Sequence, residues 1–155
     1  MTTIVTVQFD MPKLPNTPME RCRRLSAFEG KEAKGGDEGS LFKSVMLTEQ
    51  DKPLLIGYFR EGCDLCQEMI GSRLKDGANG YMVDDDGATF DFDGNMPSRA
   101  RMSFGNALCE ALTSYGMYKW LANKMPERSE QYKVMWEQMI KLCVKAALLR
   151  PKPTI

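Results

Sequence analysis

Apolar residues recur at every third or fourth position along three long stretches of this chain, at about 48–75, 98–123 and 127–149. This spacing is typical of amphipathic helices that bury one face. We expect six large side chains on these stripes to be buried: Leu55, Phe59, Leu108, Leu112, Trp136 and Ile140. The pattern therefore predicts a bundle of three main helices.

The N-terminal part of the chain predicts a strand, an extended arm and a short helix. Residues 2–9 are rich in β-branched and aromatic side chains, and a cluster of prolines ends this stretch. Thr17 is a suitable N-cap for a helix that begins at Pro18 and runs to about Gly30. The apolar face of this helix would consist of Met19, Cys22, Leu25 and Phe28.

Alternating polar and apolar residues over 81–96 predict a small β-hairpin. Asp86-Gly87 is a favoured two-residue turn, and Phe90 and Phe92 fall on one face of the second strand. The expected fold is mainly α: the three main helices and the short N-terminal helix, with the hairpin and the N-terminal strand added. We expect one domain over 1–155, with a strand and arm at 1–17, the hairpin insertion at 81–96 and an extended tail at 150–155.

Composition narrows the classes of function. Lys plus Arg and Asp plus Glu both number 21, so no net charge favours nucleic acid or an anionic membrane. The chain has no histidine, which removes the commonest general base and the commonest zinc ligand. The N-terminus does not resemble a signal peptide, and no apolar run approaches the roughly 20 residues that span a bilayer. We expect neither a membrane partner nor sequence-specific binding of nucleic acid.

The strongest catalytic candidate is the C-x-x-C pair Cys63 and Cys66, which follows an apolar run and precedes helix-forming residues. This segment looks like the active-site segment of thioredoxin-like thiol oxidoreductases. However, the helical spacing continues without a break from Leu54 to Leu74, and no further buried strand of parallel-sheet type follows. We therefore expect both cysteines to be helical and not catalytic, with thiol oxidoreductase as an alternative.

The sequence suggests two kinds of metal site, and neither is favoured. The aspartates at 84–86, 91 and 93 suggest calcium, but neither Gly87 nor Gly94 has an aspartate at the position that begins an EF-hand loop. A zinc site would need Cys109 and Cys143 to converge on the C-x-x-C pair, which their spacing does not impose. We expect no metal and no cofactor.

The basic run Arg21, Arg23 and Arg24 could contact phosphate groups, but it lacks interleaved aromatic residues. A solvated helix face is the favoured interpretation.

Four short features follow one another along residues 26–153: a D-x-x-L-L segment at 51–55, a Trp-Leu pair at 120–121, a Pro-Glu break at 126–127 before a helix that contains Tyr132, and the basic residues Arg150 and Lys152. In this layout the chain resembles the head-tail connector, or adaptor, proteins of tailed phages and prophages. The N-terminal strand and the C-x-x-C pair depart from that family's pattern and leave the position in the head-tail stack open.

The resemblance implies a virion structural protein that forms a ring of copies between portal and tail, without catalytic residues. Its partners would be other copies of itself, the portal protein, and tail or neighbouring ring proteins. Assembly would take place in the cytoplasm of the bacterial host. A helical interaction protein of another kind is the second alternative.

The extensions outside the bundle are the expected joints between subunits. A strand at 2–9 is too short to be stable alone, so it must pair with the hairpin or with a sheet edge of a neighbour. The tail would reach a second neighbour. The candidate interface residues are Ile4, Val5, Val7, Phe9, Phe90, Phe92, Arg150, Lys152 and Ile155. We expect chains without 1–16, or without 151–155, to fold but to assemble poorly.

Overall fold

The computed structural model describes residues 2–11, 16–32, 45–75 and 80–148. Its helices and strands, in chain order, are β1 (Thr2–Gln8), α1 (Pro18–Glu32), α3 (Lys52–Ile70), β2 (Tyr81–Val83), β3 (Gly87–Asp93), α4 (Ser98–Leu121) and α5 (Pro126–Leu148). Short 3-10 helices at Glu49–Asp51 and Gly71–Arg73 flank α3. The expected fold class is confirmed, since the protein is mainly helical and has a small antiparallel sheet that includes the N-terminal strand and the hairpin.

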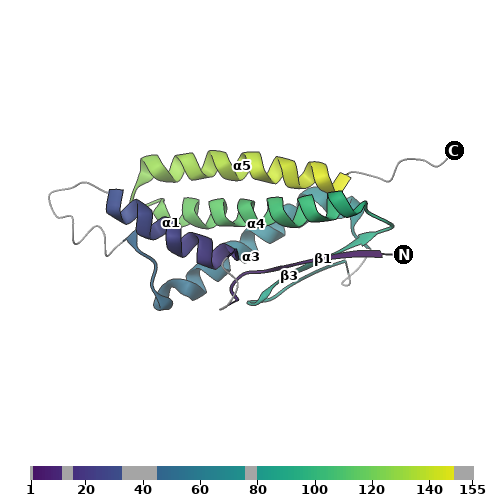
Figure 1. The fold of residues 1–155 in the computed structure, drawn as a ribbon, viewed down its shortest axis with the longest axis horizontal. Coiled ribbons are helices and arrows are strands. Elements are labelled where there is room, and N and C mark those ends of the chain that lie inside the picture. Colours follow the sequence, from purple (N-terminus) through teal and green to yellow (C-terminus); the bar gives the residue numbers. More distant parts are fainter. Residues whose placement is uncertain (1, 12–15, 33–44, 76–79, 149–155) are drawn as a thin grey trace.

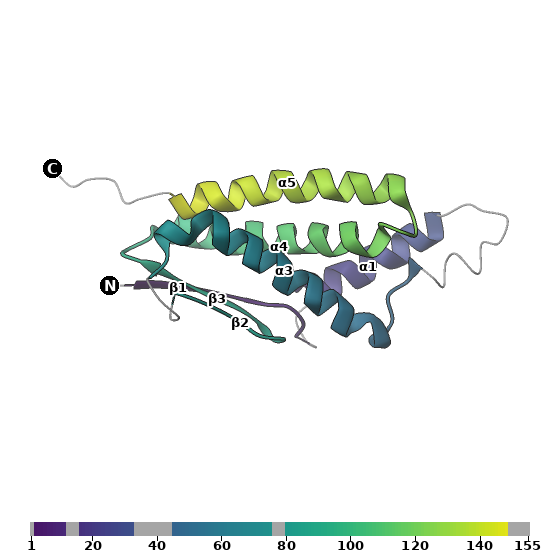
Figure 2. The ribbon, with the colours of Figure 1, turned by 180° about the vertical axis from the view of Figure 1, so that it is seen from behind.

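The helices are arranged around α4. Figure 1 shows α5 along the length of α4, with α1 in front of α4 and α3 behind it. Seen from behind, α3 crosses α4 diagonally (Figure 2). All six side chains that were expected in the core are buried, and the most exposed of them, Trp136, keeps only 7% of its surface accessible. The helical periodicity therefore identified the core correctly.

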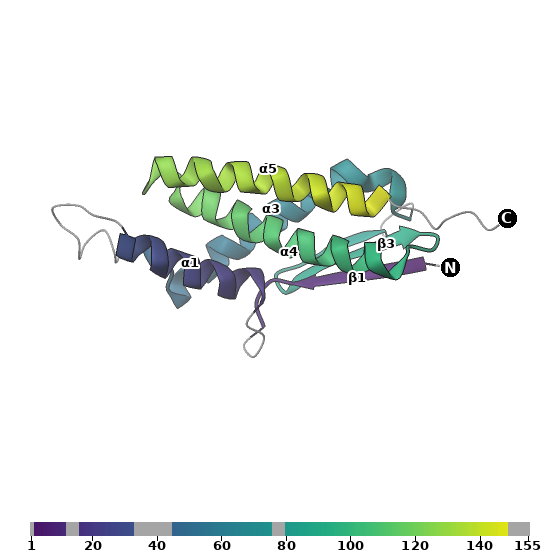
Figure 3. The same cartoon turned by 45° about the horizontal axis from the view of Figure 1, so that its top comes forward.

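The sheet packs below the N-terminal half of α4 (Figure 3). Its strand order is β1-β3-β2 and all neighbours are antiparallel. Val5 lies opposite Phe90, and the ring of Phe104 on α4 packs edge-on against Phe90 and Phe92, with centroids 5.3 and 5.0 Å away. The N-terminal strand thus pairs with the hairpin of its own chain, which is one of the two pairings that the sequence left open.

The hairpin turn lies one residue earlier than predicted. The amide of Asp84 donates to the carbonyl of Gly87, so Asp85 and Asp86, rather than Asp86-Gly87, form the two-residue loop. The carboxylate of Asp84 accepts hydrogen bonds from the amides of Asp86 and Gly87, at 2.8 and 3.1 Å, and this stabilises the turn. Gly87 instead begins β3, where a Cβ atom would lie 2.3 Å from the carbonyl oxygen of Val7.

Local signals set most helix ends. Thr17 accepts a hydrogen bond from the amide of Glu20, as expected of an N-cap, but α1 continues past Gly30 to Glu32. Thr48 and Asp51 form the expected capping box. The region at 48–75 is regular α-helix only over Lys52–Ile70. Beyond it, the buried Arg73 donates from Nε to the carbonyl of Ala147, 3.0 Å away, and so satisfies the C-terminal end of α5.

Glycines allow α1, α3 and α4 to approach one another closely. A Cβ atom at Gly116 of α4 would lie 2.7 Å from Cε1 of Phe59 on α3 and 3.2 Å from Sγ of Cys22 on α1. Because Phe59 is completely buried, its ring has little room to move aside.

We predict that Gly116→Ala lowers the free energy of unfolding by about 1–2 kcal/mol, although alanine is the better helix former by about 1 kcal/mol. Gly57→Ala is the matched control, because Gly57 lies in the middle of α3 and a Cβ atom there would meet nothing within 4 Å. That change should raise the free energy by about 0.5–1 kcal/mol. Urea unfolding of the two variants measures both effects, and equal stabilisation by both would contradict the packing argument.

Candidate functional site

The candidate interface residues on the sheet lie in the core of the single chain. Val5, Val7, Phe9, Phe90 and Phe92 are all buried beneath the helices. They alternate along β1 and β3 toward the inner face, so covering the sheet with helices removes them from the surface.

These five residues are therefore not surface contacts of the folded chain. Ile4, on the outer face of β1, is more than half exposed and remains available to a partner. Arg150, Lys152 and Ile155 lie outside the described residues.

This placement corrects the expectation for the N-terminal deletion. Removing residues 1–16 would take the apolar side chains of Val5, Val7 and Phe9 out of the core, so we expect that deletion to destabilise the fold. The strand holds the sheet to the helices in addition to any role in assembly.

The C-x-x-C pair lies inside α3, as predicted. Cys63 and Cys66 are one helical turn apart and completely buried, and Sγ of Cys66 is 3.9 Å from Sγ of Cys143 on α5. Burial raises the pKa of the Cys63 thiol well above its ordinary value. A redox thiol requires an accessible thiolate, and this environment disfavours both accessibility and ionisation. The geometry gives no support to the thiol oxidoreductase alternative.

The buried thiols predict a loss of stability at high pH. Burial raises the pKa of Cys22, and the hydrogen bond between Cys143 and Cys66 together with burial raises the pKa of Cys143. A group whose pKa is raised by folding stabilises the protein fully below its unfolded pKa, about 8.5 for a thiol, and loses that effect as the pH rises. The free energy of unfolding should be nearly constant from pH 6.5 to 8 and should then fall by up to about 1.4 kcal/mol per pH unit for each buried thiol.

Urea unfolding in the presence of a non-thiol reductant, between pH 6.5 and 10, measures this slope. The triple variant Cys22→Ala/Cys63→Ala/Cys143→Ala is the control and should show a shallower fall. An identical slope in both proteins would show that the thiols are not responsible.

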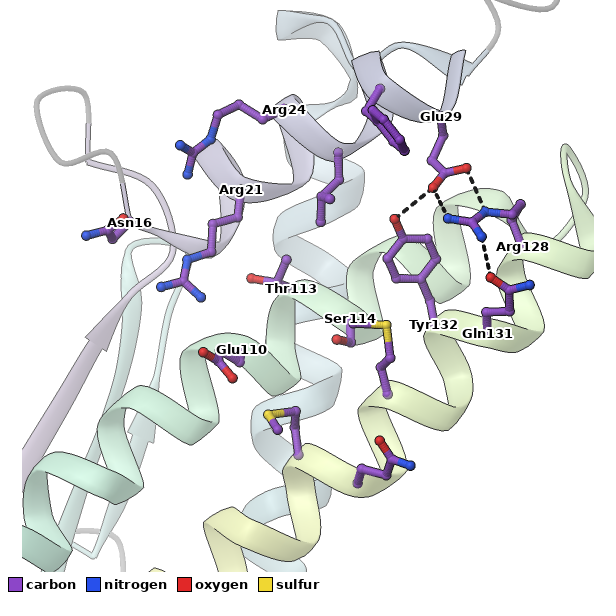
Figure 4. Close-up of a pocket in the computed structure, with 15 residues that line it drawn as sticks. Asn16, Arg21, Arg24, Glu29, Glu110, Thr113, Ser114, Arg128, Gln131 and Tyr132 are labelled. Atoms are coloured by element: carbon purple, nitrogen blue, oxygen red, sulfur yellow. Dashed lines mark hydrogen bonds and ion pairs between the residues drawn. The ribbon is translucent and has the colours of Figure 1, made fainter. Parts of the chain in front are cut away.

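A groove of about 840 Å³ lies between α1 and α5. Thr113 and Ser114 of α4 form its floor (Figure 4). Its apolar side chains come from both walls: Leu25 and Phe28 from α1, and Met135 and Met139 from α5. Phe28 and Met135 are 53% and 47% exposed, so the groove presents apolar surface to solvent. A contiguous apolar surface of this kind is a common property of protein–protein contact sites.

A buried ionic cluster closes one end of this groove (Figure 4). Glu29 of α1 is only 1% exposed, and both of its oxygens accept hydrogen bonds from Arg128 of α5, the Nε contact being 2.8 Å long. The hydroxyl of Tyr132 also donates to Glu29, at 3.1 Å. Burial raises the pKa of Tyr132, and the neighbouring Glu29 raises it further, so the phenol stays protonated and keeps donating. The cluster thus links α1 to α5 directly.

The opposite end of the groove carries positive charge on α1. Figure 4 shows Arg21 extending from α1 toward Glu110 on α4, with Arg24 one turn further along α1. Arg23, the third member of the basic run, forms an ion pair with Glu20. Arg23 and Arg24 are exposed, as expected of a solvated helix face, and Arg21 and Arg24 also line the groove.

Sequence reasoning did not identify this groove. The sequence contains part of the information, because Phe28 and Met135 belong to the apolar stripes of α1 and α5 but are not covered by the core. Glu29 and Arg128 are separated by 99 positions, and no spacing rule connects them.

The turn of the acidic hairpin is solvated, as expected, but Asp91 of β3 is mostly buried and forms an ion pair with Lys75 at 3.5 Å. Asp84, Asp85 and Asp86 are all exposed, and Asp85 forms an ion pair with Arg60 of α3 at 2.7 Å. Across the described ranges, no group of three or more Cys, Asp or Glu side chains is placed to bind a metal ion. None of the helices in those same ranges combines the length and the apolarity that crossing a bilayer requires.

Comparisons with protein-family models, curated proteins and solved structures give no match to this chain.

Proposed function

We propose that this protein is a structural subunit that assembles with copies of itself into a ring, as a head-tail connector that joins portal and tail in a tailed-phage virion. The observation that carries the proposal is the groove between α1 and α5, because Phe28 and Met135 expose apolar surface there on a rigid helical frame. Such a surface suits contact with another protein chain.

The order of the segments also supports the connector assignment. The D-x-x-L-L segment begins α3, and Leu55 packs in the core. Trp120 and Leu121 are buried at the end of α4, and the Pro-Glu break begins α5. These are the features in which the sequence resembles connector proteins. In the proposed virion the partners are neighbouring copies, the portal protein and tail or adjacent ring proteins, with assembly in the host cytoplasm.

The mass of the purified protein tests the assembly. Mass photometry should show a closed species of many copies, and Phe28→Asp/Met135→Asp should shift it toward monomer because charge would enter the apolar contact. Met69→Asp is the matched control, since Met69 is equally exposed but lies on α3 away from the groove. A wild-type protein that stays monomeric at every concentration would overturn the proposal.

A second measurement separates the alternatives. A small, fixed oligomer would favour a helical interaction protein of another kind. Reduction of insulin disulfides by the wild type, lost in Cys63→Ala/Cys66→Ala, would favour a thiol oxidoreductase. We expect no such activity, and we expect the double variant to keep its fold and assembly.

A further inference from the structure

β1 is an edge strand of the sheet over all seven of its residues. The strand order is β1-β3-β2, so among the described residues β1 has a neighbouring strand on one side only. The amide of Phe9 donates to the carbonyl of Asp86, in line with the β1–β3 register, and hydrogen-bonded pairs alternate along an antiparallel ladder. The backbone N–H and C=O groups of Ile4, Thr6 and Gln8 therefore point away from β3, toward the open edge.

A hollow of about 510 Å³ lies beside this edge, between β1 and α4. Thr6 and Gln8 line it from β1, and Met102, Gly105 and Asn106 line it from α4. Met102 is 67% exposed, so the wall on α4 offers apolar surface where a further strand would lie. Such a strand would pair with β1 through its backbone and place one of its faces toward α4.

The seven residues that follow α5, at 149–155, have the sequence pattern of a half-buried strand, because apolar and polar residues alternate strictly. The apolar set is Leu149, Pro151, Pro153 and Ile155, and the polar set is Arg150, Lys152 and Thr154. Both prolines belong to the apolar set, two positions apart. The N–H groups that they lack would therefore fall on the same edge of a strand, and the other edge would keep every donor.

This pattern fits the open edge of β1 in the antiparallel orientation. Opposed residues of an antiparallel pair share a face, and those that bond exchange both hydrogen bonds with each other. The residues opposite Ile4, Thr6 and Gln8 would lie on the outer face of the sheet, and the polar set has intact N–H groups for these bonds. The prolines would then face α4, with their nitrogens turned away from β1. In a parallel pair the bonds go to the residues beside the opposed one, so the prolines would have to donate.

The direction of α5 places this pairing between two copies. Figure 1 shows that the end of α5 and the start of β1 lie at the same end of the molecule. A strand that begins there and follows β1 of its own chain runs parallel to β1, and the prolines disfavour that orientation. Antiparallel pairing over 149–155 therefore needs the β1 edge of a second copy.

We propose that residues 149–155 of one copy add to the open edge of β1 in the next copy as a fourth, antiparallel strand. The inference rests on the proposed function, and it names a contact by which copies join. Backbone hydrogen bonds from the polar set hold the added strand, and the apolar set packs toward α4. Each copy gives one such strand and receives another, so the contact is heterologous and forms a ring when the rotation closes.

Proline substitutions at the N–H groups that face the joint test the contact. Lys152→Pro removes one of these groups from the added strand, and Thr6→Pro removes one from β1 without removing a donor of the β1–β3 ladder. Each variant should assemble about tenfold more weakly than the wild type, because a hydrogen bond is lost and the proline ring enters the contact. Lys152→Gln and Thr6→Val are the matched controls. They change the same side chains but keep the N–H groups, so they should assemble like the wild type.

Mass photometry measures assembly, and circular dichroism checks that each variant is folded. Lys152 follows the last residue of α5, so Lys152→Pro leaves every described element intact and tests the contact even if Thr6→Pro does not fold. Hydrogen exchange followed by mass spectrometry observes the joint directly. Amides of residues 2–8 should exchange more slowly in the wild type than in Lys152→Pro at the same protein concentration, because the added strand protects the open edge.

The outcomes distinguish this inference from the proposed function. A wild type that stays monomeric at every concentration overturns the ring, and this contact with it. A wild type that assembles, with Lys152→Pro assembling equally well, removes this contact and leaves the ring standing. Equal weakening by Lys152→Pro and Lys152→Gln would assign the effect to the charge of Lys152 and would also overturn the added strand.

Discussion

Phe104→Ala should lower the free energy of unfolding by about 4–5 kcal/mol, the largest effect that we expect from a single substitution. Phe104 is completely buried on α4, and its ring packs edge-on between Phe90 and Phe92 of β3. The substitution removes the favourable free energy of burying the ring, leaves a cavity between α4 and the sheet, and breaks two aromatic contacts. The sheet and the helical bundle are joined at this point, so the loss should be cooperative.

Chemical denaturation monitored by circular dichroism measures this effect. Met102→Ala is the control, because Met102 lies on the same turn of α4 but is largely exposed, and it should change the stability by no more than about 0.5 kcal/mol. A cost below about 2 kcal/mol for Phe104→Ala would show that the sheet is held mainly by other contacts.

Arg128→Ala should lower the free energy of unfolding by about 2–3 kcal/mol. The change leaves the carboxylate of Glu29 buried without its ionic partner, and among the described residues the hydroxyl of Tyr132 still donates to it. Loss of one partner from a completely buried pair costs about 3–5 kcal/mol, and we expect less here because Arg128 itself is 38% exposed and water can replace part of the interaction.

The double variant Glu29→Gln/Arg128→Met distinguishes the cost of an unpaired buried charge from the loss of the packing around it. It removes both charges, so it should be more stable than Arg128→Ala alone, although one further residue is changed. Arg101→Ala, at an exposed position of α4, controls for the simple loss of an arginine. If Arg128→Ala and Arg101→Ala were equally stable, the cluster would have no part in holding α1 against α5. The spacing of α1 and α5 then has to come from the apolar walls of the groove.

The sequence by itself determined the helices, the strand and most of the core. Leu55, Phe59, Leu108 and Leu112 repeat at helical spacing, and a spacing of that kind creates one apolar face whatever packs against it. Thr17 and the Thr48–Asp51 pair mark helix starts because capping hydrogen bonds form between residues a few positions apart. Periodicity and capping hydrogen bonds depend on residues that are close together in the sequence. They can therefore be predicted without knowing which segment packs against them.

Only the tertiary structure decided which apolar positions stay uncovered and which distant residues meet. Phe28 and Met135 lie on stripes like those of the core residues, but they remain exposed because α1 and α5 both pack on α4 and leave a groove between them. Phe90 was expected at a joint between subunits and lies in the core instead, because the sheet packs below α4. Burial depends on contacts between residues far apart in the chain. The periodicity of one segment does not show which of its apolar residues the other segments will cover.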